Sequence, residues 1–212
     1  MIAIIDYGMG NLHSVSQALE RLGYDYVITD SKEQIELAAG VILPGVGAFG
    51  DAMKQLKETG LDQVIQEITT SGKPLLGICL GMQLLFESSE EGGEWEGLSL
   101  LKGKAKRLPG VNTQGEKYKV PHMGWNKLHY KQAAHPLLEG IEEGYTYFVH
   151  SFYMTGLDEE ELIAYADYHE RVPGVVGRNN VLGMQFHPEK SGQTGIQLLA
   201  NFGKLCEGVK VG

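Results

Sequence analysis

The sequence predicts an α/β fold with a doubly wound, mostly parallel sheet and helices on both faces. Three observations support this prediction. Short apolar runs alternate with stretches of helical periodicity up to about residue 87. Several apolar runs end in glycine-rich segments, as strands do before tight turns. The length of 212 residues suits one α/β domain, which we expect to span residues 1–212.

The first half of the chain supplies the parallel strands. Residues 2–5 form an apolar run that enters a glycine turn, and residues 12–22 carry apolar side chains at helical spacing until Gly23. Residues 24–29 form a second strand, and Ser31 with Gln34 is typical of a helix capping box. The next elements are a strand at 41–43, helices near 51–57 and 61–70, a strand within 73–79 and a helix at 80–87.

The second half of the chain differs from the first in composition and in its expected secondary structure. Residues 88–97 are acidic and contain glycine, which favours a solvated surface loop. Residues 98–184 are richer in strands and turns, and a last helix is expected near 192–206. Since ligands bind at the carboxyl ends of strands in such sheets, the glycine-rich segments there are the candidate site.

Composition and charge exclude several classes of function. The net charge of −9 argues against nucleic-acid binding as the main role. No apolar run is long enough to span a membrane, and the N-terminus does not resemble a signal peptide. The two cysteines lie in unlike contexts, which indicates no disulfide and fits the cytoplasm. The histidines show no metal-ligand spacing, so we expect no metal site.

The strongest motif is Gly-Ile-Cys79-Leu80-Gly after an apolar run. It has the form of a nucleophile elbow, in which small neighbours let the chain turn sharply from strand to helix. The NH of Leu80 is then available to stabilise an oxyanion. The alternative is a buried structural cysteine between two glycines. Cys206, which stands in no polar motif, fits that structural interpretation.

A second motif, Gln-Phe-His187-Pro-Glu189-Lys190, pairs an imidazole with a carboxylate. In an extended segment residues two apart share a face, so Glu189 could orient His187 toward a thiol. The alternative is a turn histidine beside a surface glutamate.

A third motif, Pro44-Gly45-Val46-Gly47, follows a predicted strand. Its backbone NH groups could complete an oxyanion hole opposite Leu80. The alternative is a simple turn, and the motif lacks the Lys-Ser/Thr of a phosphate-binding loop.

These motifs together resemble the class I (triad) glutamine amidotransferases. The resemblance covers residues 2–202 in the stretches IIDYGMGNLHSV, LPGVGAFGDAM, GICLGMQLLFE, VPHMGWN, YFVHSFY and GMQFHPEKSGQTGIQLLANF. The motifs DYGMGN, PHMGWN and HPEKS are similar to those of glutaminase subunits that pass ammonia to a separate cyclase subunit in histidine biosynthesis. The resemblance implies a flavodoxin-like fold, L-glutamine as substrate and no cofactor.

The resemblance also implies roles for individual residues. Cys79 is the nucleophile, His187 moves protons and Glu189 holds His187. The implied oxyanion hole is Val46, Gly47 and Leu80; the implied glutamine-binding residues are Gly45, Gln83, His150, Ser151 and Phe152; and the implied partner interface is Asn11, Trp125 and Lys190. For Trp125 the alternative is an ordinary core aromatic residue.

Two other functions stay open from the sequence. A cysteine hydrolase of esters or lactones also uses a G-x-C-x-G elbow, but α/β-hydrolases place the acid before the histidine, and here the acid follows it. The second open function is that of an inactive docking subunit. Such a subunit would need none of the three triad residues.

Overall fold

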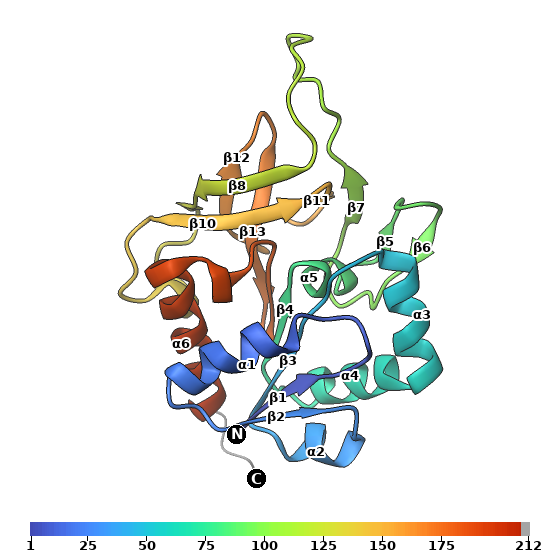
Figure 1. Ribbon diagram of the computed structural model, residues 1–212, viewed down its shortest axis with the longest axis vertical. Helices are drawn as coiled ribbons and strands as arrows, with labels where there is room; N and C mark the ends of the chain where they lie inside the picture. The colour runs from blue at the N-terminus through green and yellow to red at the C-terminus, as the bar shows by residue number, and fades with distance from the viewer. Residues whose placement is uncertain (209–212) are drawn as a thin grey trace.

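The computed structural model describes residues 1–208 and centres on an eight-stranded sheet (Figure 1). The strand order is β2-β1-β3-β4-β14-β13-β12-β9. The strands from β2 to β14 run parallel to one another, and β13, β12 and β9 extend the sheet in antiparallel fashion. The predicted mostly parallel sheet is therefore present, with an antiparallel extension.

The parallel strands are short and deeply buried. Their bounds are β1 (Ile2–Ile5), β2 (Tyr26–Thr29), β3 (Gly40–Leu43), β4 (Leu75–Ile78) and β14 (Val181–Met184). Every residue of β1, β3, β4 and β14 is buried, as expected for strands covered on both faces. The second strand begins at Tyr26 rather than at residue 24.

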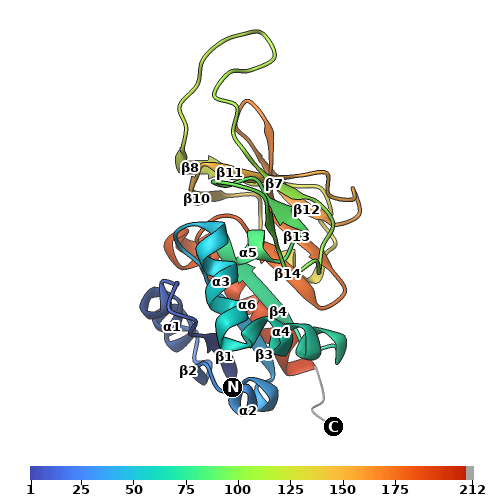
Figure 2. The ribbon, with the colours of Figure 1, turned by 90° about the vertical axis from the view of Figure 1, so that its right-hand side faces the viewer.

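Helices cover both faces of this sheet (Figures 1 and 2). They are α1 (Leu12–Arg21), α2 (Lys32–Leu37), α3 (Phe49–Thr59), α4 (Leu61–Thr70), α5 (Leu80–Leu84) and α6 (Gly192–Gly208). Side chains of β1 alternate between the two resulting cores: Ala3 and Ile5 pack with α2, α3 and α4, and Ile2 and Ile4 pack with α1 and α6. The predicted cap of α2 is confirmed, because Ser31 Oγ accepts from the NH of Gln34.

Helix α5 is shorter than the helix predicted at 80–87. It ends at Leu84 because the following carbonyl groups bind a returning segment instead of continuing the helix. The carbonyl of Leu84 accepts from the NH of Leu98, and that of Leu85 accepts from Leu100 and Leu101.

The remaining strands build the upper part of the molecule in Figure 1. They are β5 (Ser88–Ser89), β6 (Trp95–Glu96), β7 (Lys104–Arg107), β8 (His122–Lys127), β9 (His129–Tyr130), β10 (Tyr145–His150), β11 (Phe152–Thr155), β12 (Leu162–Asp167) and β13 (Arg171–Arg178). Strands β8 and β10 form a two-stranded antiparallel sheet, and β11, β7, β5 and β6 form a four-stranded sheet. The short 3-10 helices are η1 (Pro136–Leu138) and η2 (Pro188–Lys190).

The prediction of an unstructured surface loop at residues 88–97 is wrong in part. Strands β5 and β6 lie within it and pair as an antiparallel hairpin. Beyond β7, a long hairpin projects from the body (Figures 1 and 2). A β-bridge between Val111 and Lys117 and hydrogen bonds between Asn112 and Glu116 join its two arms.

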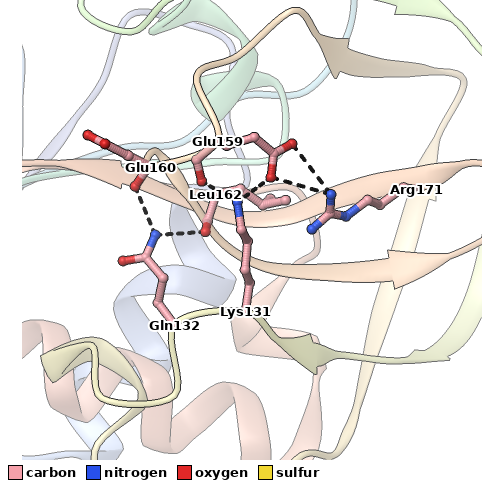
Figure 3. Close-up of polar contacts among 6 residues, drawn as sticks. All are labelled: Lys131, Gln132, Glu159, Glu160, Leu162 and Arg171. Carbon is pink, nitrogen blue, oxygen red and sulfur yellow. Dashed lines mark hydrogen bonds and ion pairs between the residues drawn. The ribbon is translucent and has the colours of Figure 1, made fainter.

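A polar cluster ties the turn before β12 to the chain after β9 (Figure 3). Lys131 and Arg171 pair with Glu159, and Gln132 Nε2 donates to the carbonyls of Glu160 and Leu162 at 2.8 and 2.7 Å. The ion pairs are exposed and therefore contribute little free energy, whereas the amide bonds fix backbone groups. Within residues 1–208, no helix is both long and apolar enough to cross a membrane.

Candidate active site

Cys79 stands on a strained turn between β4 and α5. Its backbone has φ 55° and ψ −114°, a left-handed φ that a non-glycine residue rarely adopts. The neighbouring glycines allow this turn. A Cβ on Gly77 would lie 2.6 Å from the carbonyl oxygen of Gly81, and a Cβ on Gly81 would overlap the carbonyl of Leu43. The predicted strand-to-helix elbow is present.

The thiol faces a cavity of about 380 Å³ at the carboxyl ends of the parallel strands. Its walls come from every predicted site motif except the partner interface. The lining residues are Val46, Gly47, Cys79, Leu80, Gln83, Glu91, Pro121, Val149, His150, Ser151, Phe152 and His187.

His187 and Glu189 form a buried pair beside Cys79. The Nδ1 atom of His187 lies 2.8 Å from Oε1 of Glu189, and the Glu189 side chain is fully buried. Burial alone would lower the pKa of His187, but hydrogen bonds to Cys79 and Glu189 and their charges outweigh it and raise the pKa to about 9. The site therefore favours an imidazolium beside the sulfur, which is the arrangement that activates a cysteine nucleophile.

The expected extended geometry of this motif is wrong. Residues Pro188–Lys190 form the 3-10 helix η2, which brings the Glu189 carboxylate back toward the imidazole of His187. Tyr147 and Ser191 fix the position: the NH of His187 donates to the carbonyl of Tyr147, and Ser191 Oγ donates to the carbonyl of His187 at 2.6 Å. The contact predicted from the spacing is present, but a helical turn produces it.

The Pro44–Gly47 segment lies directly against the elbow. A Cβ on Gly45 would meet the amide nitrogen of Gly81 at 2.7 Å and the hydroxyl of Tyr7 at 2.8 Å, so only glycine fits there. Gly47 has φ +98°. Leu80 is the first residue of α5, so its NH has no acceptor within the helix. The Pro44–Gly47 segment and the start of α5 thus both border the cavity beside Cys79.

Gln83 contacts the opposite wall. Its Nε2 donates to the carbonyl of Phe152 at 3.1 Å and to Oε1 of Gln185 at 3.0 Å. Gln185 is fully buried, and its Nε2 lies 4.0 Å from Cys79 Sγ. The sequence interpretation missed Gln185, although it belongs to the same Gln-Phe-His-Pro-Glu motif as the predicted pair.

His150 lies at the cavity, but its ring is not free to bind a ligand. Its Nδ1 is 2.8 Å from the carbonyl of Phe152, and its Nε2 is 3.0 Å from Nδ1 of His122. The ring of His150 is therefore engaged inside the protein, and the prediction that the segment 150–152 binds glutamine rests on its backbone and on its place in the cavity lining. Ser151 and Phe152 line the cavity as expected.

Glu91 is a lining residue that the sequence interpretation missed. It belongs to the segment expected to be a solvated loop, yet its Oε2 accepts from the NH of Phe49, at the start of α3, at 2.8 Å. The acidic run gave no signal that one of its carboxylates turns inward.

The predicted interface residues lie outside the cavity. Trp125 is 56% exposed, so the alternative of a core aromatic residue is wrong. Met123 and Tyr145 are also exposed on the paired strands β8 and β10 and form an apolar face with Trp125. Lys190 is exposed, and Asn11 immediately precedes α1.

The second cysteine is remote from this site. Cys206 is buried in α6, and burial raises the pKa of its thiol to about 12, so it stays neutral. Within the part of the chain that the structure describes, no three His, Cys, Asp or Glu side chains are placed to hold a metal ion.

An α/β sheet with a cysteine elbow and a His-Glu pair at its carboxyl edge defines a class I glutamine amidotransferase. The family "Glutamine amidotransferase class-I" matches residues 3–205. The solved structure of a glutamine amidotransferase superposes with a TM-score of 0.75 at 22% identity, and the match covers 98% of this chain and 100% of that chain. The structure of PurLQS from Thermotoga maritima superposes with a TM-score of 0.70 at 22% identity, and the match covers 96% of this chain and 97% of that chain.

Closer relatives define the subfamily. The imidazole glycerol phosphate synthase subunit HisH of Halalkalibacterium halodurans is 57% identical over 211 residues, which cover 99% of each chain. The subunit of the same name in Bacillus subtilis is 56% identical over 211 residues, which cover 100% of this chain and 99% of the relative. The chain belongs to the HisH family of class I glutamine amidotransferases.

Proposed function

We propose that this chain hydrolyses L-glutamine to glutamate and ammonia as the glutaminase subunit of an imidazole glycerol phosphate synthase. The observation that carries the proposal is that Cys79 and His187 meet at one cavity, with Glu189 bound to the far side of the His187 ring. The carboxylate of Glu189 binds Nδ1 of His187, so Nε2 is the ring nitrogen that can exchange a proton with the thiol. The relatives that are subunits of imidazole glycerol phosphate synthase support the assignment to that enzyme.

The proposed reaction begins when the Cys79 thiolate attacks the side-chain carbonyl carbon of glutamine. The NH groups of Leu80 and Gly47 stabilise the oxyanion; loss of one such donor typically costs about 10²–10³ in rate. His187 gives its proton to the departing ammonia. Water then attacks the glutamyl thioester with His187 as base, which releases glutamate and restores the thiol. No cofactor takes part.

The cavity offers groups of suitable charge for the rest of the substrate. Glu91 brings a carboxylate to the wall, which suits the α-ammonium group of glutamine. The backbone of residues 151–152 lines the same cavity and supplies polar groups for the α-carboxylate end, while both amide hydrogens of Gln83 are donated inside the protein.

The ammonia must reach a synthase without becoming ammonium in water. We therefore propose that the chain forms a heterodimer with a cyclase subunit in the cytoplasm. That subunit would use the ammonia to form imidazole glycerol phosphate and an aminoimidazole carboxamide ribotide. The exposed apolar face of Met123, Trp125 and Tyr145 supports docking of a protein partner beside the cavity. Asn11 and Lys190 are the proposed polar members of that interface.

The test is glutamine hydrolysis by the chain alone, with the cyclase subunit, and with cyclase plus its acceptor substrate. We expect turnover to be highest in the third mixture. Hydrolysis of activated esters without glutamine turnover would favour a cysteine hydrolase instead. Tight binding to the cyclase with no turnover of either substrate would favour an inactive docking subunit.

A further inference from the structure

A chain of hydrogen bonds runs from Asn126 to the cavity wall, and its direction can be assigned. Asn126 Nδ2 donates to the carbonyl of Asp167 at 2.9 Å, while its Oδ1 accepts from the NH of Lys127 at 2.8 Å. These two partners fix the orientation of the amide. Nδ2 also lies 3.3 Å from Nε2 of His122, which must therefore accept.

The same order of donor and acceptor continues through His122 and His150. With Nε2 as an acceptor, a neutral His122 carries its proton on Nδ1 and donates it to Nε2 of His150 at 3.0 Å. His150 then carries its proton on Nδ1 and donates to the carbonyl of Phe152 at 2.8 Å. The carbonyl at the far end can only accept, so the assignments from the two ends agree. Protonation of either ring would place two donors face to face.

The surroundings favour the neutral rings. His122 is 2% exposed and is stacked between Phe148 and Tyr168, with ring centroids at 4.6 and 3.9 Å. Burial lowers the pKa of His122 to about 4. Burial, and then the charge of His122, lowers the pKa of His150 to about 3. Both rings are neutral at the pH of a cell.

We propose that His122 and His150 are positioning residues that fix the Phe152 carbonyl, and with it the cavity wall that binds glutamine. This inference rests on the proposed function. The Phe152 carbonyl also accepts from Gln83 Nε2, which in turn donates to Gln185 beside Cys79. One carbonyl thus receives a donor from each side of the cavity, and the two histidines hold it in place for Gln83.

A purely structural role predicts a different residue dependence. If His122 only fills the space between Phe148 and Tyr168, phenylalanine should replace it well and asparagine poorly. If it acts as a donor, asparagine should replace it better, because its amide nitrogen can stand near the position of Nδ1. Phenylalanine would leave His150 Nε2 without a donor, so the proton of His150 would no longer be held on Nδ1.

The first experiment compares His122→Phe with His122→Asn in the complex with the cyclase subunit. We expect His122→Phe to raise KM for glutamine about tenfold, with less than about threefold change in kcat. His122→Asn should stay within about threefold of the wild-type KM, although it melts at a lower temperature. Alkylation of Cys79 by iodoacetamide should be unchanged in both. A KM that follows thermal stability instead, with Asn worse than Phe, would overturn the proposal.

The second experiment does not depend on glutamine. The ¹⁵N shifts of the imidazole nitrogens in the wild-type protein at pH 7 should show a protonated Nδ1 and a bare Nε2 in both His122 and His150. An Nε2–H tautomer or a doubly protonated ring at either residue would overturn the relay. If the wild-type complex fails to hydrolyse glutamine while these tautomers are found, the proposed function fails and the relay geometry stands.

Discussion

The hydroxyl of Tyr7 donates a 2.8 Å hydrogen bond to the carbonyl oxygen of Pro44. Tyr7 is buried, and its burial, followed by the charge of Cys79, raises the pKa of the phenol, so the hydroxyl stays protonated and remains a donor. The loop that carries Gly45, Val46 and Gly47 is therefore anchored at its first residue, while its glycines leave the following peptide units free to rotate.

Replacing Tyr7 with phenylalanine should release this anchor. We expect a loss of about 1 kcal/mol in the free energy of unfolding and about a three- to tenfold lower kcat in the complex, because the loop no longer holds its donor in place. The matched control is Tyr24→Phe, which removes a similar tyrosine-to-carbonyl bond, to Ala200, outside the cavity. Equal loss of turnover in both variants would show that the anchor has no special role.

Cys79→Ala should abolish glutamine hydrolysis and leave the fold and the binding of the cyclase unchanged. Cys79 is 8% exposed and the turn is shaped by Gly77 and Gly81, so removing the thiol removes the nucleophile alone. Turnover and affinity for the cyclase are the two measurements. Substantial turnover by the purified variant would end the assignment of Cys79.

Much of this site could be predicted because its signals are local. The elbow motif predicts the turn at Cys79, since only small neighbours permit the close approach of α5 to β3. The His187–Glu189 contact followed from the spacing, although a 3-10 turn and not an extended strand produces it. The site formed as expected because both motifs end adjacent parallel strands, β4 and β14.

The missed residues depend on contacts distant in sequence. Glu91 turns inward because it caps α3 from the hairpin of β5 and β6, whose strands are only two residues long each. The role of His150 depends on His122, a residue of another strand, and on the amide orientation of Asn126. Neither pairing leaves a periodic pattern in the sequence, so only the folded structure reveals them.

Gly47→Ala should weaken activation by the cyclase. Gly47 has φ +98°, and an added Cβ would lie 2.9 Å from the end of the Met9 side chain. We infer that the Val46–Gly47 peptide rotates between a resting and an active orientation, which lie within a few kcal/mol of each other. Turnover with cyclase and acceptor should fall about tenfold, while alkylation of Cys79 by a small reagent persists. Gly60→Ala, which has φ +73° and open space, controls for backbone strain alone. Normal activation of Gly47→Ala would place the rotating peptide elsewhere.

The His187–Glu189 pair links stability to pH. The pKa of His187 is raised from 6.5 to about 9 in the folded protein, so between these values the folded state holds a proton that the unfolded state has released. The resulting stabilisation is fully present below about pH 6.5 and is lost as the pH rises through about 9. Because one pKa unit corresponds to about 1.4 kcal/mol, the rise from 6.5 to about 9 corresponds to an effect on the order of 3–4 kcal/mol.

Glu189→Gln should reduce this dependence. The amide keeps the shape of the side chain and can still accept from Nδ1, but it removes the negative charge that helps to raise the pKa of His187. The free energy of unfolding is measured in urea at pH 6 and at pH 9.5. Between pH 6 and pH 9.5, the wild-type protein should lose about 1–2 kcal/mol more of this free energy than the variant. Glutamine turnover should fall less in Glu189→Gln than in His187→Ala, since the carboxylate only orients and stabilises the imidazolium. The same pH slope in both proteins would show that Glu189 does not stabilise the charge on His187, and its role would then be to hold the ring in place.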